Sequence, residues 1–197
     1  QACKNSSTPN DNEFVVSGKL INTKSETIYL EELLINKTQI IDSTQMNEEG
    51  EFFFKAAISD AGFYLLRIKD RNHITLLIKP SETIHITGDA LRLERTYDVS
   101  GSDDCKKINE MYKQYYLNSA RIDSLRDVYI TSQVRTDFAQ FKDKLDTAYM
   151  NIFNNQKTYI KNFIKQNHTS MISILALYQT FGQQRIIANE DELPYTE

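Results

Sequence analysis

The chain has 197 residues, 40% of them hydrophobic, which is enough to bury the core of one large or two small domains. Its formal net charge of −4 argues against nucleic-acid binding, which uses a basic face. The longest apolar stretches have the length of a strand, whereas a helix that crosses a membrane needs about 20 apolar residues.

Residues 1–12 are predicted to form a flexible leader, because they are polar and lack apolar periodicity. Cys3 lies within this leader, so burial in a core does not explain it. The sequence starts at Gln1 rather than at Met and ends at Glu197 without a helix stop signal. We therefore expect it to be part of a longer protein.

Residues 13–101 show the two-residue period of β-strands. In the first segment, Phe14, Val16, Gly18 and Leu20 share one face. Turn signals at 22–25, 47–50, 60–62, 70–72 and 80–81 separate short strands, which predicts an antiparallel β-sandwich or open barrel. No helix is available between these strands to connect parallel neighbours, so we do not expect a parallel sheet.

From residue 102 to 197 the apolar period changes to that of a helix. Two long helices are predicted, with Ser102 or Asp103 as the first N-cap. A short loop would join them into an antiparallel hairpin. A third helix is predicted over 170–182, capped by Thr169 or Ser170 and ended by Gly182. The predicted fold class is α+β, with the strands first. The apolar positions of the two long helices are Ile108, Met111, Tyr115, Ile122, Leu125 and Tyr129, then Phe138, Phe141, Leu145, Tyr149, Ile152, Phe153, Ile160 and Phe163.

The segment "IDSTQMNEEGEFFF" offers oxygen ligands for a cation, but it also fits a β-hairpin that turns at Asn47–Gly50. A calcium loop places oxygen ligands at every second position around a sharp glycine turn. This segment lacks that arrangement, so we favour the hairpin. His73, His85 and His168 have no partner at metal-ligand spacing, and neither Ser43 nor Ser81 lies in a nucleophile elbow. We therefore predict no catalytic residue, no metal and no cofactor.

Tyr112, Tyr115 and Tyr116 form either a partner-binding patch or a seam between helices, and helical spacing favours the seam. Cys105 lies one turn into the first long helix, where the helix N-terminus can lower a thiol pKa. A reactive thiol is one interpretation of Cys105. We favour a structural cysteine, because no resolving cysteine, His or Lys motif lies beside it.

The order of several segments carries a resemblance to a known family. Residues 13–180 resemble the N-terminal region of Bacteroidetes-type envelope thiol–disulfide oxidoreductases. These proteins carry a β-rich DUF4369 domain, a helical segment and a thioredoxin-like domain of the AhpC/TSA, TlpA and ResA type. The segments concerned are "FVVSGKLIN", "ETIYLEEL", "IIDSTQMNEEGEFFFKA", "GFYLLRI", "TLLIKPSETIHITGD", "YDVSGSDDCKKINE" and "FIKQNHTSMISILAL".

The sequence also departs from that family. It has no Trp and no C-x-x-C motif, so it lacks the dithiol of the redox domain, and Cys105 stands where the family often has Ser. The resemblance implies that the first mature residue is lipidated, and "QAC" fits the end of a lipobox with Cys3 as the attachment point. A polar leader suits a tether. The resemblance therefore places the globular part in the bacterial envelope, anchored to a membrane and outside the cytoplasm.

Our main hypothesis is a non-catalytic N-terminal region of an envelope-anchored thiol–disulfide oxidoreductase. It would position its own thioredoxin-like domain or bind a protein client. The alternative is a surface or periplasmic binding lipoprotein that recognises peptide or glycan and has no redox role. An independent enzyme has the least support, because no catalytic constellation can be assembled from the sequence.

Overall fold

The computed structural model describes residues 8–69 and 72–187, which belong to two units, Gln1–Glu110 and Met111–Glu197. The boundary between the units falls inside a long helix, further along the chain than the change of period at residue 102. Each unit is described by itself. The α+β class predicted from the sequence is confirmed, with the strands preceding the long helices.

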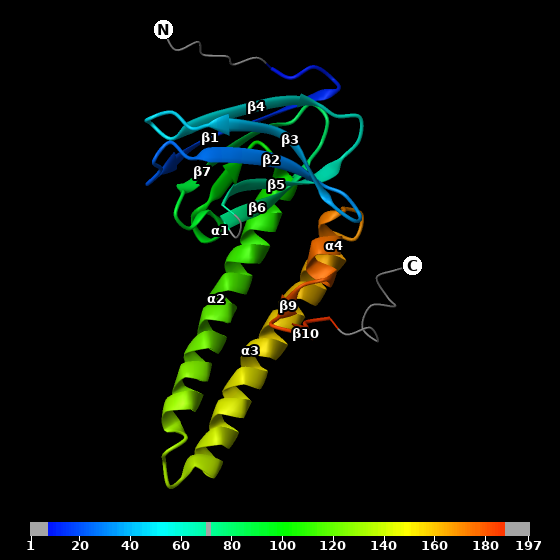
Figure 1. Cartoon of the computed structure of the whole chain (residues 1–197). Helices are drawn as coiled ribbons and strands as arrows, with labels where there is room; N and C mark the ends of the chain where they lie inside the picture. The colour runs from blue at the N-terminus through cyan, green and yellow to red at the C-terminus, as the bar shows by residue number, and fades with distance from the viewer. Residues whose placement is uncertain (1–7, 70–71, 188–197) are drawn as a thin grey trace. The chain divides into compact units, whose positions relative to one another are not determined.

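The first unit contains two four-stranded sheets and a short helix, α1 (Figure 1). One sheet has the order β4-β1-β7-β8, and the other has the order β3-β2-β5-β6. The sheets pack face to face as an open sandwich. The bounds are β1 Glu13–Ile21, β2 Thr27–Leu33, β3 Thr38–Gln45, β4 Glu51–Ala57, β5 Gly62–Lys69, β6 Asn72–Ile78, β7 Thr83–Asp89, α1 Leu93–Thr96 and β8 Asp98–Ser100.

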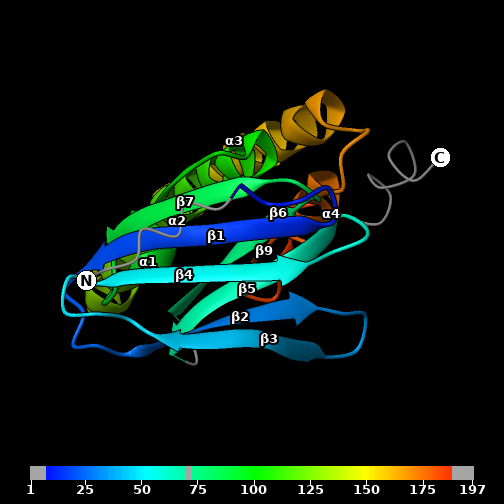
Figure 2. The same cartoon turned by 90° about the horizontal axis from the view of Figure 1, so that it is seen from above.

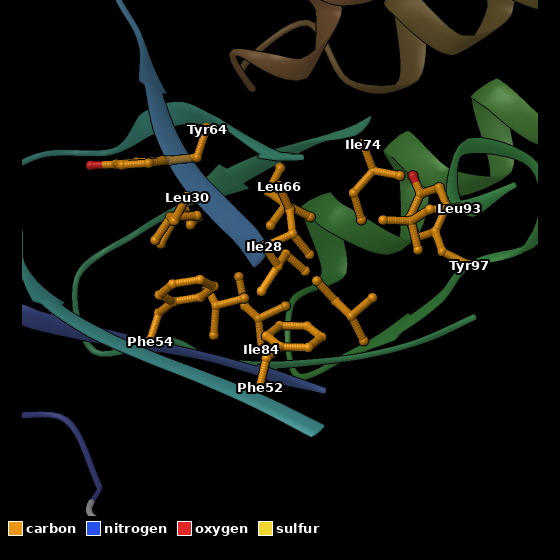
Figure 3. Packing of buried hydrophobic residues seen from close by; sticks show 14 of the residues in the cluster. Ile28, Leu30, Phe52, Phe54, Tyr64, Leu66, Ile74, Ile84, Leu93 and Tyr97 are labelled. Carbon is orange, nitrogen blue, oxygen red and sulfur yellow. The ribbon is translucent and has the colours of Figure 1, made fainter. Parts of the chain in front are cut away.

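The core lies between the two sheets, where apolar side chains from alternate strand positions meet (Figure 3). Phe14, Val16 and Leu20 are fully buried, as the two-residue period predicts. Gly18 shares their face by the same alternation, and a Cβ there would lie 2.1 Å from the carbonyl oxygen of Ile86. The glycine therefore lets β1 approach its neighbour closely.

The sandwich contains one parallel pair, which the sequence analysis did not expect. β1 and β7 are parallel, with Val16 opposite Ile84 and Gly18 opposite Ile86. The expectation was wrong because it considered only a helix as the crossover. Here the chain leaves the first sheet for β2 and β3, returns to it for β4, and leaves again for β5 and β6 before it forms β7 (Figure 2).

The predicted hairpin at Asn47–Gly50 is also corrected. The turn exists, since the backbone N–H of Gly50 donates to the Asn47 carbonyl at 2.9 Å. However, the strands on its two sides do not pair. β3 pairs with β2, whereas β4 pairs with β1 in the other sheet. The turn therefore carries the chain between sheets, and Gly50 supports it with a positive φ of 77°.

The second unit contains the rest of α2 (Asp103–Ser132), together with α3 (Phe138–Gln166), α4 (Ile172–Leu177), β9 (Thr180–Phe181) and β10 (Gln184–Arg185). The hairpin of α2 and α3 is confirmed (Figure 1). Near the connection, the rings of Tyr129 and Phe138 lie 5.5 Å apart. No helix in the described part of the chain combines the length and apolarity that a membrane span requires.

The third helix is shorter than the sequence predicts. α4 has six residues, and Met171 occupies its N-cap position without a side-chain cap, while the Ser170 hydroxyl accepts a bond from the Ile172 N–H at 3.4 Å. Gly182 lies in the turn between β9 and β10 with a φ of 58°. The helix stops early because Gln179 and Ile186 pair through their backbones, which turns this segment into a small hairpin.

Candidate functional site

Cys105 lies at the start of α2, and the Ser102 cap holds this start in place. The backbone N–H of Cys105 donates to the Ser102 hydroxyl at 3.4 Å, which confirms one of the two predicted caps. The Cys105 thiol is fully buried and donates to the carbonyl oxygen of Leu77 in β6 at 3.2 Å. The sulfur is therefore directed into the protein and away from solvent.

The environment of Cys105 disfavours the thiolate. Burial raises the pKa of the thiol to about 11, although the hydrogen bonds with Ser102 and Leu77 act in the opposite direction. A reactive cysteine needs a lowered pKa and access to its reaction partner. The burial of the Cys105 sulfur outweighs its place near the helix start, and this geometry favours the structural interpretation.

An ion pair lies beside this cysteine. Lys79 Nζ is 2.5 Å from Asp104 Oδ2, and the Asp104 side chain is nearly buried. The hydrogen bond to Asp104 raises the pKa of Lys79 against the opposing effect of burial. Because the ammonium group is held by a carboxylate, Lys79 stays protonated and cannot serve as a base for Cys105.

The outer face of the second sheet carries a buried carboxylate that the sequence analysis did not single out. Glu31 of β2 is 5% exposed, and its Oε1 accepts a bond from Arg67 Nε of β5 at 2.8 Å. The guanidinium of Arg67 also lies over the Tyr29 ring, 4.6 Å from its centroid. Two strands are thus joined by a satisfied charge pair with a cation–π contact. The only sequence signal was a glutamate within a β-rich segment, which is usually exposed.

The second unit contains a buried chain of side-chain amides. Asn118 Nδ2 of α2 donates to Gln156 Oε1 of α3 at 2.7 Å. Gln156 Nε2 donates in turn to Gln179 Oε1 at 2.8 Å, just after α4. Gln156 is fully buried. The signal for this chain was present in the sequence, because Gln156 continues the apolar stripe of Phe153 and Ile160 at helical spacing.

The tyrosines singled out in the sequence belong to an aromatic cluster around Phe181 of β9. The Tyr115 ring stacks on Phe181 with centroids 5.3 Å apart, and the Phe153 ring of α3 meets Phe181 at 6.3 Å. Burial raises the pKa of Tyr115. Tyr112 and Tyr116 are half-buried, and their rings lie 6.3 Å apart. Tyr115 thus packs within the unit, and its principal partner is the β9 hairpin rather than α3.

A shallow depression of about 290 Å³ lies between the end of α3 and α4. Ile164 and Leu177 supply aliphatic walls, and Thr169, Ser170 and Ser173 supply hydroxyl groups. His168 lines the same depression, with its Nδ1 3.1 Å from the carbonyl oxygen of Lys165. Aliphatic walls with hydroxyl groups suit the binding of a small side chain.

The remaining candidates lie apart from one another. His85 is exposed on β7, 3.3 Å from the Ser17 hydroxyl. The backbone N–H of Ser43 is held by the carboxylate of Asp42 at 2.7 Å, and the Ser81 hydroxyl donates to the Asp11 carbonyl at 3.3 Å. Within residues 8–69 and 72–187, no three His, Cys, Asp or Glu side chains are arranged to hold a metal. Cys3 lies outside the described residues.

The comparisons with known proteins concern mainly the first unit. Residues 14–108 match the family model described as "Domain of unknown function (DUF4369)". These residues form a DUF4369 domain. The DUF4369 domain thus takes in the strands of the sandwich and the start of α2 with Cys105. The DUF4369 part of the sequence resemblance is confirmed.

The other comparisons add little. The structure of the 5-hydroxyisourate hydrolase of Klebsiella pneumoniae is 14% identical, covers 48% of this chain and 96% of its own, and has a TM-score of 0.30. A TM-score this low does not establish a shared fold, so it says nothing about function. No curated protein matches the chain.

Proposed function

We propose that this chain is a non-catalytic N-terminal region of an envelope-anchored thiol–disulfide oxidoreductase. It positions a thioredoxin-like domain or binds the client of that domain. The observation that carries the proposal is the DUF4369 domain at residues 14–108, in the place that the resemblance gives to the β-rich region. The order of the segments that follow it supports the same assignment.

The non-catalytic part of the proposal has its support at Cys105. Dithiol chemistry needs a cysteine of low pKa with a resolving partner. The thiol of Cys105 is fully buried and its pKa is raised to about 11. It therefore suits a role in packing α2 against β6 rather than a redox role.

The reading frame beyond Glu197 is the first test. A continuation that encodes a thioredoxin-like domain with a W-C-x-x-C motif supports the proposal, and a stop codon close to Glu197 overturns it. In parallel, the 197-residue chain is assayed for insulin reduction with dithiothreitol as the electron donor. The expected rate equals that of the Cys105→Ser variant, and a higher rate in the wild type contradicts a non-catalytic role.

The envelope location and the lipid anchor at Cys3 belong to the same proposal. Several acyl chains on one cysteine hold a protein stably on a membrane, whereas one chain gives only marginal binding. Metabolic labelling with a palmitate analogue tests this in cells that express the complete precursor. The expected result is incorporation that is lost in Cys3→Ser, with release of that variant from the membrane fraction.

The competing proposal is a binding or assembly lipoprotein that recognises peptide or glycan without a redox role. The depression between α3 and α4 favours it, because its aliphatic walls and hydroxyl groups suit such ligands. Glycan arrays and pull-downs with the 197-residue chain separate the two proposals. Ile174 lines the depression and is 47% exposed, so Ile174→Asp alters its wall without placing a charge in the core. Ligand capture that Ile174→Asp abolishes, together with a reading frame that stops near Glu197, supports the binding lipoprotein.

A further inference from the structure

The turn between β2 and β3 exposes a group of large aliphatic side chains. Ile35 is 100% exposed, Ile40 is 56% exposed and Leu33 is 40% exposed. Lys37 lies on the same turn and is also exposed. We call Leu33, Ile35, Lys37 and Ile40 the β2–β3 tip. Aliphatic side chains gathered at a loop tip mark an interaction surface more often than scattered single ones do.

The β2–β3 tip is held by backbone geometry. The Leu34 N–H donates to the Lys37 carbonyl at 2.9 Å, so Ile35 and Asn36 are the two central residues of the turn. Leu33 pairs with Thr38 on the opposite strand. Neither central residue has a positive φ, but turns in general favour Gly, Pro, Asn, Asp and Ser rather than a large aliphatic residue. Neither turn formation nor core packing therefore explains why a fully exposed isoleucine occupies this position.

The β2–β3 tip lies at the end of the sandwich where the N-terminal leader joins β1 (Figure 2). The strand registers place it there. Glu13 at the start of β1 is opposite Ala57 at the end of β4. The chain then enters β5, where Tyr64 is opposite Glu32, next to the tip. The leader and the β2–β3 tip therefore share one end of the domain.

The length of the leader limits how far this end can lie from an anchor. This step rests on the proposed lipid attachment at Cys3. Pro9 is buried, and the Glu13 N–H donates to the Asn10 carbonyl at 3.0 Å, so this part of the leader is folded against the domain. Six residue steps separate Cys3 from Pro9, and a chain of that length spans at most about 22 Å. β1 alone, with nine residues, is about 30 Å long. The end that carries the β2–β3 tip is thus the end that the anchor keeps nearest to the bilayer.

We propose that the β2–β3 tip binds the surface of the lipid bilayer. Ile35 enters the boundary between headgroups and acyl chains, and Leu33 and Ile40 extend the apolar contact. Lys37 reaches the lipid phosphates with its ammonium group while its aliphatic stem stays in the apolar layer. The contact forms reversibly in the untethered chain, and a tether strengthens it by raising the local concentration of the tip at the membrane.

The absence of Trp from the sequence gives a direct test. Ile35→Trp introduces a single fluorophore at the β2–β3 tip. Val134→Trp is the matched control, because Val134 is 92% exposed in the connection between α2 and α3. Both are made in the unlipidated Cys3→Ser chain and mixed with vesicles of phosphatidylcholine and phosphatidylglycerol. We expect a blue shift and quenching by brominated lipid for Ile35→Trp alone. Equal spectra for the two variants overturn the proposal.

A second measurement compares how the wild type and an Ile35→Asn variant partition onto vesicles. Ile35→Asn places a favoured turn residue at an exposed position, so the fold is kept. Its partition onto the same vesicles is expected to fall about tenfold, the loss that follows from removing one buried aliphatic side chain. Unchanged partition overturns the inference. Palmitate labelling of Cys3 is independent of these assays, so a failed anchor and a failed tip contact give different results.

Discussion

The buried amide chain of the second unit gives the sharpest stability prediction. Gln156→Leu removes the acceptor for Asn118 and the donor for Gln179, which are 2.7 Å and 2.8 Å away. Each partner left unsatisfied in the interior costs about 1–3 kcal/mol. The leucine recovers part of this loss through its apolar surface. We therefore expect the free energy of unfolding of this unit to fall by about 2–4 kcal/mol.

The assay is urea unfolding followed by the helical circular dichroism signal, with thermal unfolding beside it. In a chain of this size, 1 kcal/mol corresponds to about 2–4 °C in Tm, so we expect a decrease of about 4–16 °C. Gln140→Leu is the matched control, because Gln140 is exposed on the same helix. A surface change of this kind shifts stability by no more than about 0.5 kcal/mol.

Two results would refute the reasoning about this chain. One is a Gln156→Leu variant that matches the Gln140→Leu control in stability. The other is a double variant, Asn118→Leu with Gln156→Leu, whose loss in free energy of unfolding equals the sum of the two single losses. Two groups that share a hydrogen bond should instead show a coupling energy of about 0.5–3 kcal/mol.

Four further predictions concern the DUF4369 domain. Cys105 in the native chain should react slowly with a maleimide at neutral pH, and unfolding in urea should make the reaction fast. Burial raises the pKa of the folded Cys105 thiol to about 11, above that of the unfolded thiol. The resulting stability is fully present below the pKa of the unfolded thiol and is lost as the pH rises through 11. Urea unfolding at a series of alkaline pH values measures this loss. Gly18→Ala should destabilise by about 3 kcal/mol or cause the domain to misfold, since its Cβ would lie 2.1 Å from the Ile86 carbonyl oxygen, and urea unfolding measures this loss. Glu31→Gln should cost about 1–3 kcal/mol in the same assay, because the buried hydrogen bond between Glu31 and the half-buried Arg67 loses the negative charge of its acceptor.

These predictions have their own controls and contrary outcomes. Glu49→Gln alters an exposed pair with Lys19 and should change stability by less than about 1 kcal/mol. An equal loss for the Glu31 and Glu49 variants argues against a special role for the buried pair. Rapid maleimide labelling of native Cys105 contradicts its structural role. A Gly18→Ala domain of wild-type stability contradicts the close approach of β1 and β7.

The sequence by itself determined the local features of the fold. The two-residue period identified the buried face of β1, with Phe14, Val16 and Leu20, because alternate side chains of a strand point to opposite sides. The change to a 3.6-residue period marked the start of α2, and Ser102 was one of its two predicted caps. Each of these features depends on residues that are close together along the chain.

Other features were decided only by the tertiary structure. Nothing in the sequence of β1 specifies β7 as its parallel neighbour, and the Asn47–Gly50 turn did not reveal that its two strands join different sheets. The buried state of Cys105 depends on Leu77, and that of Gln156 on Asn118 and Gln179, all of them distant in sequence. The physical reason is common to these cases. Periodicity records which face of an element is apolar, whereas the pairing of strands and buried polar groups depends on which distant segment packs against that face.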